Sequence, residues 1–271
     1  MKNFELISFA NADELALRAA SAWLDEIESA NRAGKTHCVA LSGGRMTQKF
    51  FAATVEQAKA RAASFERVHF FWADERCVPP TDPDSNFKLA NECLFAPLKI
   101  PANQIHRIRG EEPPDKAATL ATAEMIRIVP SCDGERSRLG CGSPRLATNK
   151  NANDEASLAA REARALPILD LICLGMGEDG HVASLFPDAP PEILNCTAPF
   201  LAIENSPKPP PRRISLSYAA IAAAKQVWVL VSGTGKETAL RESVSPTGKT
   251  PLARVIQSRP QTRIFSDFQL G

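Results

Sequence analysis

The sequence predicts a layered α/β fold, in which a mostly parallel β-sheet is flanked by helices. Three observations predict it: short apolar runs recur along the chain, segments with helical periodicity fall between them, and polar motifs follow several of the runs directly. Strands that alternate with helices form parallel sheets, and a strand buried on both faces is apolar throughout. Ligands of such folds bind at the carboxyl ends of the strands, where the polar motifs lie.

The predicted elements alternate along the chain. A short strand at 4–9 precedes a helix that begins at residue 13 and ends by Gly34, with apolar residues at helical spacing. The remaining strands are continuous apolar runs, and shorter helical segments separate them. The strands are 37–41, 68–72, 169–174 and 226–231, and the helices are 86–95, 116–128 and 236–243.

We expect residues 1–271 to form a single catalytic α/β domain that carries one insertion. Residues 130–165 are rich in Ser, Gly, Arg, Asn and Ala, and they lack sustained apolar periodicity apart from a weak helical pattern after Asn153. Long segments of this kind do not fit inside a compact domain. The sequence therefore predicts a mobile surface insertion there.

The composition excludes several functional classes. Apolar residues make up 44% and charged residues 23%, as in soluble globular proteins. The net charge of +1 predicts no attraction to nucleic acid or to an anionic membrane, and no apolar run approaches the roughly 20 residues that cross a bilayer. Seven scattered cysteines without a CxxC pair, and a polar N-terminus, favour a reducing cytoplasmic location.

The motif Ser42-Gly43-Gly44 directly follows the predicted strand 37–41. Two glycines there let the backbone approach a ligand and expose its N–H groups at the start of a helix, which suits a phosphate or an oxyanion. A glycine pair after a strand is more often a simple turn, and this motif alone does not decide between the two interpretations.

The motif Asp74-Glu75-Arg76 follows the apolar strand 68–72. Charges at the end of a buried strand are costly unless they are paired or used in a site. The alternative is a solvated pair of loop acids. Nearby, Asp84 or Ser85 is a candidate cap for the helix that begins at Asn86.

The segment 175–180 has the pattern GxGxxG after a strand, but prolines interrupt the sequence soon afterwards. A dinucleotide-binding loop needs a full helix at that point, so we reject this interpretation. The turn instead presents Asp179 and His181. Histidine accepts a proton near neutral pH, and a carboxylate beside it can orient the ring. His69 lies inside an apolar strand, so we interpret it as a core residue whose ring nitrogens have hydrogen-bond partners. The other two histidines, His37 and His106, lie at strand edges and have no acidic glycine turn beside them.

The proline-rich segment 207–213 holds three cations, Lys208, Arg212 and Arg213, before a stretch that we interpret as apolar and helix-like. A stiff loop loses little entropy when its cations bind a phosphate. A polyproline ligand or a solvated linker is the alternative. The chain has no GxSxG, HExxH, paired-cysteine zinc pattern or P-loop, which argues against a serine hydrolase, a zinc enzyme or an ATPase.

Four segments together resemble the 6-phosphogluconolactonases. They are LSGG at 41–44, FFWADERCVPPTDPDSN at 70–86, LDLICLGMGEDGHVASLFP at 169–187 and KPPPRRISLS at 208–217, and the resemblance continues through VWVLVSGTGKETAL at 227–240. It implies the fold shared with glucosamine-6-phosphate deaminases and ribose-5-phosphate isomerases. It also implies hydrolysis of 6-phospho-D-glucono-1,5-lactone to 6-phospho-D-gluconate, in the oxidative pentose phosphate pathway, without a metal or another cofactor.

By this resemblance, His181 is the general base for water, and Asp74 and Glu75 help to place the water and the substrate. Asp179 is the carboxylate beside the base. The family commonly continues Ser-Thr-Pro after the Ser-Gly-Gly motif, whereas this chain reads Arg45-Met46-Thr47, so we hypothesise that Arg45 replaces the hydroxyl contacts. The residues expected to bind the substrate or its phosphate are Ser42, Gly43, Gly44, Arg45, Arg76, Asn86, Lys208 and Arg213.

Two other functions stay open at this point. One is an amino-sugar phosphate isomerase or deaminase on the same fold, in which the acid at the strand end moves a proton on carbon. The other is a non-catalytic sugar-phosphate-binding protein. The expected partner is a small phosphorylated sugar lactone, with no nucleic acid and no membrane, and the sequence is compatible with a monomer but does not determine the oligomeric state.

Overall fold

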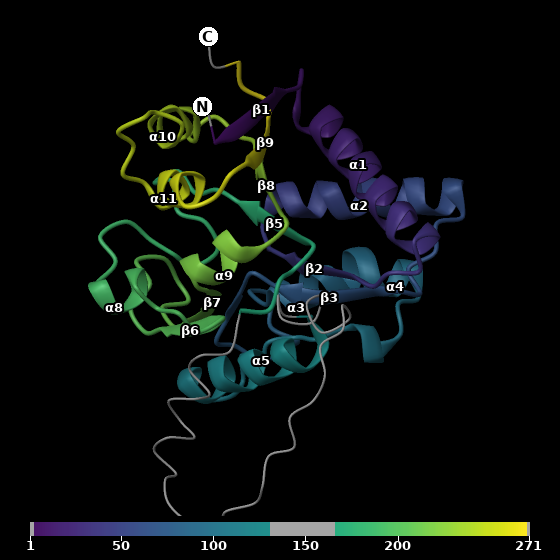
Figure 1. The fold of residues 1–271 in the computed structure, drawn as a ribbon, viewed down its shortest axis with the longest axis horizontal. Helices are drawn as coiled ribbons and strands as arrows, with labels where there is room; N and C mark the ends of the chain where they lie inside the picture. Colours follow the sequence, from purple (N-terminus) through teal and green to yellow (C-terminus); the bar gives the residue numbers. More distant parts are fainter. Residues whose placement is uncertain (1–2, 131–165, 270–271) are drawn as a thin grey trace, which may run out of the picture.

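The computed structural model describes residues 3–130 and 166–269, and a six-stranded parallel sheet runs through its centre (Figure 1). Every pairing in this sheet is parallel, as the apolar runs predict. The strands, in their spatial order, are β1 (Phe4–Ser8), β9 (Thr262–Ser266), β8 (Gln226–Val231), β5 (Leu171–Gly175), β2 (His37–Leu41) and β3 (Val68–Trp72).

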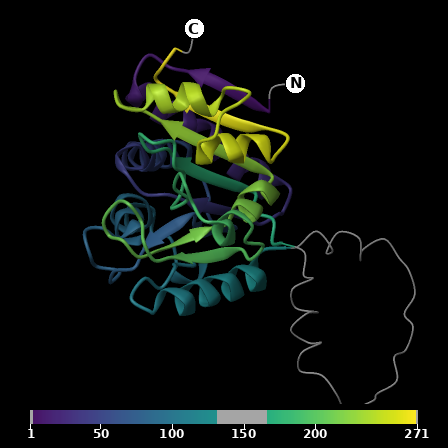
Figure 2. The same ribbon diagram turned by 90° about the vertical axis from the view of Figure 1, so that its left-hand side faces the viewer.

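Helices cover both faces of this sheet. Figure 1 shows α1 and α2 on one side and α9, α10 and α11 on the other, and Figure 2 shows α10 and α11 in front of the strands. The helical elements are α1 (Ala12–Arg32), α2 (Arg45–Arg61), α3 (Asn86–Ala90), the π-helix η1 (Asn91–Phe95), α4 (Ala96–Leu98), the 3₁₀-helix η2 (Ala102–Gln104), α5 (Pro114–Ile128), α8 (Pro191–Leu194), α9 (Tyr218–Ala223), α10 (Glu237–Ser243) and α11 (Pro251–Gln257).

A second, smaller sheet consists of three short antiparallel strands. Its strands are β4 (Asp74–Arg76), β7 (Arg213–Leu216) and β6 (Phe200–Ile203), in the order β4-β7-β6. The helix-like interpretation of the stretch after the proline-rich loop is wrong at its start, because Arg213–Leu216 pairs as a strand with β4 and β6 and the helix begins only at Tyr218.

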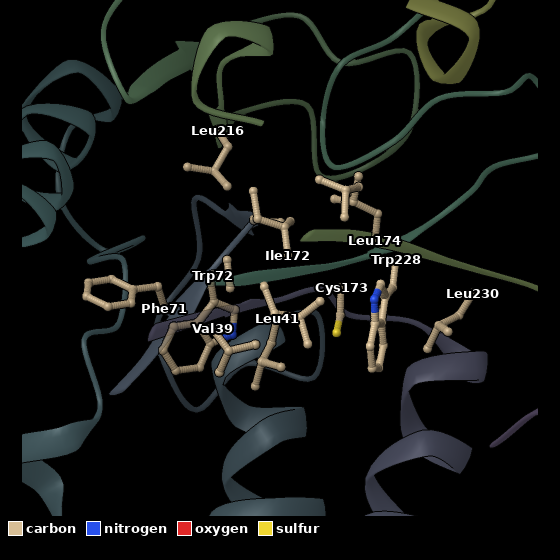
Figure 3. Packing of buried hydrophobic residues seen from close by; sticks show 14 of the residues in the cluster. Val39, Leu41, Phe71, Trp72, Ile172, Cys173, Leu174, Leu216, Trp228 and Leu230 are labelled. Carbon is tan, nitrogen blue, oxygen red and sulfur yellow. The ribbon is translucent and has the colours of Figure 1, made fainter. Parts of the chain in front are cut away.

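The core lies on both faces of the large sheet. Helix α1 begins at the Asn11 cap, whose side chain accepts the Asp13 and Glu14 N–H groups, and buries one apolar stripe that includes Trp23. Figure 3 shows Ile172 and Leu174 pointing to one face of β5 and Cys173 to the other. Full burial of one large apolar side chain contributes about 1.5–3 kcal/mol.

The predicted boundaries need small changes. The strand expected at 169–174 begins two residues later, and the helix expected at 86–95 is divided into α3 and η1. The expected insertion lies outside the described residues, apart from Pro130. Within the described residues, no helix is both long and apolar enough to cross a membrane.

Candidate active site

The loops that follow four neighbouring strands meet at one small cavity. Strands β8, β5, β2 and β3 are adjacent and parallel, so their carboxyl ends share one edge of the sheet. The cavity at this edge has a volume of about 170 Å³. Its lining consists of Ser42, Gly43, Gly44, Arg45, Met46, Thr47, Asp74, Arg76, Asn86, Gly175, Met176, Gly177, His181, Ala183, Arg213, Leu230 and Lys236.

The start of helix α2 forms one wall of this cavity. Gly44 precedes the helix with φ of 102°, and no side chain caps the exposed N–H groups. These groups lack intrahelical acceptors and carry the positive end of the helix dipole. The Ser42 hydroxyl is buried in the same wall and has no hydrogen-bond partner in the described part of the chain. This wall is therefore suited to an anion.

Two cations line the cavity beside this wall. Arg45 is the first residue of α2, and Lys236 is the cap residue of α10 in the loop after β8. Burial, and then the charge of Arg45, lowers the pKa of Lys236, whereas Glu178 raises it. Lys236 was missing from the residues predicted for the site. The sequence could have indicated it, because Lys236 lies in a polar loop that follows an apolar strand, as the other motifs do.

Gly43 must be a glycine because the chain passes very close to Asn86. A Cβ at Gly43 would lie 1.8 Å from Asn86 Oδ1. The Asn86 amide in turn donates to the backbone carbonyl of Asp74 at 2.9 Å and to its Oδ1 at 3.2 Å. Asn86 therefore joins the loop after β2 to the loop after β3.

His181 and Asp179 form a closely held pair in the loop after β5. The distance from His181 Nδ1 to Asp179 Oδ1 is 2.5 Å, and the same oxygen accepts the His181 backbone N–H at 3.3 Å. A Cβ at Gly177 would lie 2.0 Å from Nδ1, so only glycine leaves room for the ring. Because the carboxylate holds a proton on Nδ1, the lone pair is on Nε2.

The two groups of this pair are held in the protonation states that a base needs. Burial lowers the pKa of His181 below its ordinary value of 6.5, although Asp179 acts in the opposite direction. Burial acts to raise the pKa of Asp179, but the hydrogen bond and charge of His181 bring it below its usual value. Near neutral pH the imidazole is therefore neutral and the carboxylate is ionised.

Asp74 is a second carboxylate in the wall, and it is only 4% exposed. Its Oδ2 accepts a hydrogen bond of 2.6 Å from the Ser184 hydroxyl, and its Oδ1 accepts one from the Asn86 amide. Ser184 belongs to the stretch just after His181. The hydrogen bond therefore ties the loop of the base to the end of β3.

Glu75 is not among the lining residues, because successive side chains of a strand point to opposite faces. Its Oε1 accepts the N–H groups of Arg76 and Asn86, and its Oε2 accepts the Phe87 N–H, all at 2.8 Å. Burial raises the pKa of Glu75 against these backbone hydrogen bonds. A direct contact with substrate stays a prediction, and the geometry favours an indirect role, in which Glu75 positions Asn86.

The three cations that the resemblance assigns to phosphate occupy different positions. Arg76 lines the cavity, donates to the Asp84 carbonyl at 2.5 Å, and has a buried Nε without a partner in the described part of the chain. Arg213 also lines the cavity, but most of its donors bind the carbonyl groups of the 208–210 loop. Lys208 is not a lining residue, and its Nζ lies 3.8 Å from Asp179 Oδ1.

The other three histidines lie outside the cavity. His69 is half-buried rather than buried, and its Nδ1 is 2.8 Å from His106 Nε2. His106 in turn contacts Glu124 at 2.7 Å. His37 is buried and lies 3.3 Å from the Trp23 indole nitrogen. All three rings therefore have partners away from the site.

No metal site is apparent in the described chain. Across residues 3–130 and 166–269, no group of three or more His, Cys, Asp or Glu side chains is arranged to hold a metal ion. The five cysteines in these two stretches are free thiols.

Comparison with known proteins identifies the family. Residues 10–264 match the family model of glucosamine-6-phosphate isomerases/6-phosphogluconolactonase. A 6-phosphogluconolactonase of Mycobacterium tuberculosis is 35% identical over 190 residues, which cover 69% of this chain and 65% of the relative's length. One from Treponema pallidum is 31% identical over 216 residues, covering 79% of this chain and 75% of the relative.

A solved structure agrees with the sequence comparisons. The 6-phosphogluconolactonase of Thermotoga maritima is 25% identical, with a TM-score of 0.70 and coverage of 97% of this chain and 98% of that chain. The likeness extends over the parallel sheet whose strand ends form the cavity. This chain belongs to the family of glucosamine-6-phosphate isomerases and 6-phosphogluconolactonases.

Proposed function

We propose that this chain hydrolyses 6-phospho-D-glucono-1,5-lactone to 6-phospho-D-gluconate, the second step of the oxidative pentose phosphate pathway. One observation carries the proposal: a single cavity holds a histidine oriented by a carboxylate and a helix start suited to an anion. The similarity to proteins named 6-phosphogluconolactonase supports it.

The substrate has a phosphate at one end and a lactone carbonyl at the other, and the cavity has the start of α2 on one side and His181 on the other. The phosphate is a dianion at neutral pH, and it fits the first turn of α2 with Ser42, Arg45 and Lys236 around it. The lactone carbonyl is an electrophile that needs an activated water. With the phosphate bound at α2, the carbonyl faces His181 and Arg76.

In the reaction, His181 Nε2 takes a proton from water while the water oxygen attacks C1 of the lactone. Negative charge develops on the carbonyl oxygen, where the Arg76 guanidinium, which lines the cavity, and the backbone N–H groups of the glycine loop are the donors. The C1–O5 bond then breaks, and the imidazolium returns the proton to the ring oxygen. The product is the open acid, and His181 is neutral again.

The test is a stopped-flow assay with freshly generated lactone, in which the spontaneous opening is measured in parallel. We expect His181→Asn to lower kcat by about 10²-fold or more, because a general base contributes at least that much. The control is His69→Asn, which replaces a half-buried histidine outside the cavity. Wild-type protein that does not exceed the spontaneous rate would overturn the proposal.

A deaminase or isomerase acting on an amino-sugar phosphate is the second candidate. The observation that favours it is the Asp74 carboxylate in the cavity wall, because a carboxylate can move a proton on carbon. Release of ammonia from glucosamine 6-phosphate would identify this activity. Binding of 6-phosphogluconate without either reaction would instead identify a non-catalytic sugar-phosphate-binding protein.

We also propose that the chain is one catalytic unit that works as a monomer in the cytoplasm. The free thiols of the described cysteines support a reducing compartment. Sedimentation of the protein at assay concentration tests the monomer, since a dimer that dissociates with loss of activity would contradict it.

A further inference from the structure

The ring of Phe186 packs between two groups of the active-site wall. Its centroid lies 4.7 Å from the centroid of the His181 ring, and the Cζ atom of Arg213 lies 5.6 Å from the Phe186 centroid. The side chain is only 7% exposed. Phe186 does not line the active-site cavity, so its contacts reach the reaction through His181 and Arg213.

A different cavity lies against Phe186. This outer cavity has a volume of about 300 Å³ and shares no lining residue with the active-site cavity. It is lined by Phe186, Pro187, Tyr218, Thr250, Arg254 and their neighbours. The aromatic ring therefore separates the imidazole of His181 from a second hollow that is open to solvent.

We propose that Phe186 is a positioning residue of the lactone hydrolysis: its ring holds the His181 imidazole against Asp179 and keeps water of the outer cavity away from that pair. This inference rests on the proposed function. Exclusion of water on the side of the imidazole strengthens the hydrogen bond between His181 and Asp179, because water competes for the ring, which is 17% exposed, whereas the Asp179 side chain is 33% exposed and stays in contact with solvent. It also leaves Nε2 as the only ring nitrogen that a water molecule can reach, on the substrate side.

The effect of Phe186 on His181 differs from that of the charged groups around the ring. These are Asp179 from the same loop, Lys208 from the proline-rich loop and Asp74 from β4. Phe186 carries no charge, so it acts through burial, which is the largest cause of the lowered pKa of His181. Removal of the aromatic ring admits water and therefore raises the pKa of His181.

The experiment compares Phe186→Leu and Phe186→Ala with Phe186→Trp. The larger indole has room to extend into the outer cavity and is expected to restore the barrier. The matched control is Phe65→Leu. Phe65 lies in the loop before β3, is also 7% exposed, and packs against Trp23 and Phe70, away from the active-site cavity. If Phe186→Ala does not fold, Phe186→Leu carries the test.

Two measurements are made on each variant. The first measurement follows the NMR signals of the His181 ring during a pH titration without substrate. These signals are identified as the ones that are missing from the spectrum of His181→Asn. The second measures kcat and KM for the lactone. We expect Phe186→Leu to move the His181 midpoint to higher pH and to lower kcat about tenfold, with less than a twofold change in KM. Phe186→Trp and Phe65→Leu should keep the wild-type midpoint.

An unchanged His181 midpoint in the folded Leu and Ala variants would overturn the inference. So would equal losses in Phe186→Leu and Phe65→Leu, because that result indicates a general loss of stability. The NMR titration needs no turnover, so it tests Phe186 even if the wild-type protein does not hydrolyse the lactone. Failure of the proposed function and failure of this inference are thus separate results.

Discussion

At the scale of single residues, the site requires His181 to keep a proton on one ring nitrogen and a lone pair on the other. Asp179 enforces this difference through its contact with Nδ1. In Asp179→Asn, the amide can turn its NH₂ group toward Nδ1, which moves the proton to Nε2 and blocks the base. We expect kcat to fall by about 10²-fold or more, as measured by stopped flow. Retained binding of 6-phosphogluconate is the control, and an unchanged kcat would contradict the assignment.

We expect the two cations beside α2, Arg45 and Lys236, to act on binding rather than on turnover. We expect Arg45→Ala and Lys236→Ala each to raise KM for the lactone by roughly tenfold, because a hydrogen bond to a charged group contributes about 1.5–3 kcal/mol. Lys49→Ala is the matched control, since Lys49 lies one turn further along α2, pairs with Asp13 and does not line the cavity. If Arg45→Ala leaves KM unchanged, Arg45 does not replace the hydroxyl contacts.

The structure brings most of the residues predicted for the site to one cavity, and many of them belong to motifs that directly follow an apolar strand. Nine of the twelve predicted residues line the cavity; the other three are Glu75, Asp179 and Lys208. Lys236 was missed although its loop follows the apolar strand β8, whereas Ser184 and Phe186 were not predicted because their roles depend on which loops face each other across the sheet edge. No spacing along the chain carries that information.

At the scale of elements, the second sheet was the least predictable part. Its strands have only three or four residues, and Asp74 and Arg213 carry charges that suit a loop as well as a strand. The pairing of Asp74 with Ser215 and of Arg76 with Arg213 exists only in three dimensions. The central strands β2, β3, β5 and β8 were predictable, because burial on both faces requires continuous apolar runs. Strand β9 was not predicted, because the polar residues of Thr262–Ser266 interrupt its apolar pattern.

The Glu75 carboxylate accepts the first N–H groups of α3, those of Asn86 and Phe87. We expect the replacement of one carboxylate oxygen to lower the stability of the fold. In Glu75→Gln, an NH₂ group replaces one carboxylate oxygen and faces a donor, either a backbone N–H or the Ser85 hydroxyl. We expect unfolding in urea to show a loss of about 1–3 kcal/mol, the usual cost of a buried unsatisfied polar group. A variant as stable as the wild type would show that Glu75 does not hold the helix start.

At the scale of the whole molecule, burial of His181 gives the enzyme a pH dependence. Its folded pKa lies below 6.5, so the neutral base is present above that pKa and is lost as the pH falls through it. We expect the acid limb of kcat/KM, which reports the free enzyme, to have a midpoint for His181 below pH 6.5. The same group contributes stability that is present above 6.5 and lost as the pH falls through the folded pKa. A midpoint at or above 6.5 would contradict this assignment.

The parallel pairing of β1 with β9 has a consequence for biosynthesis. Within the described residues, Phe4–Ser8 pairs only with Thr262–Ser266, a strand that is synthesised much later. Contacts so distant in sequence form slowly, and strand β1 has an open edge until β9 has been synthesised. The nascent chain therefore exposes an unpaired strand while all of the residues between β1 and β9 are made, and an exposed strand edge favours pairing with other chains during that time.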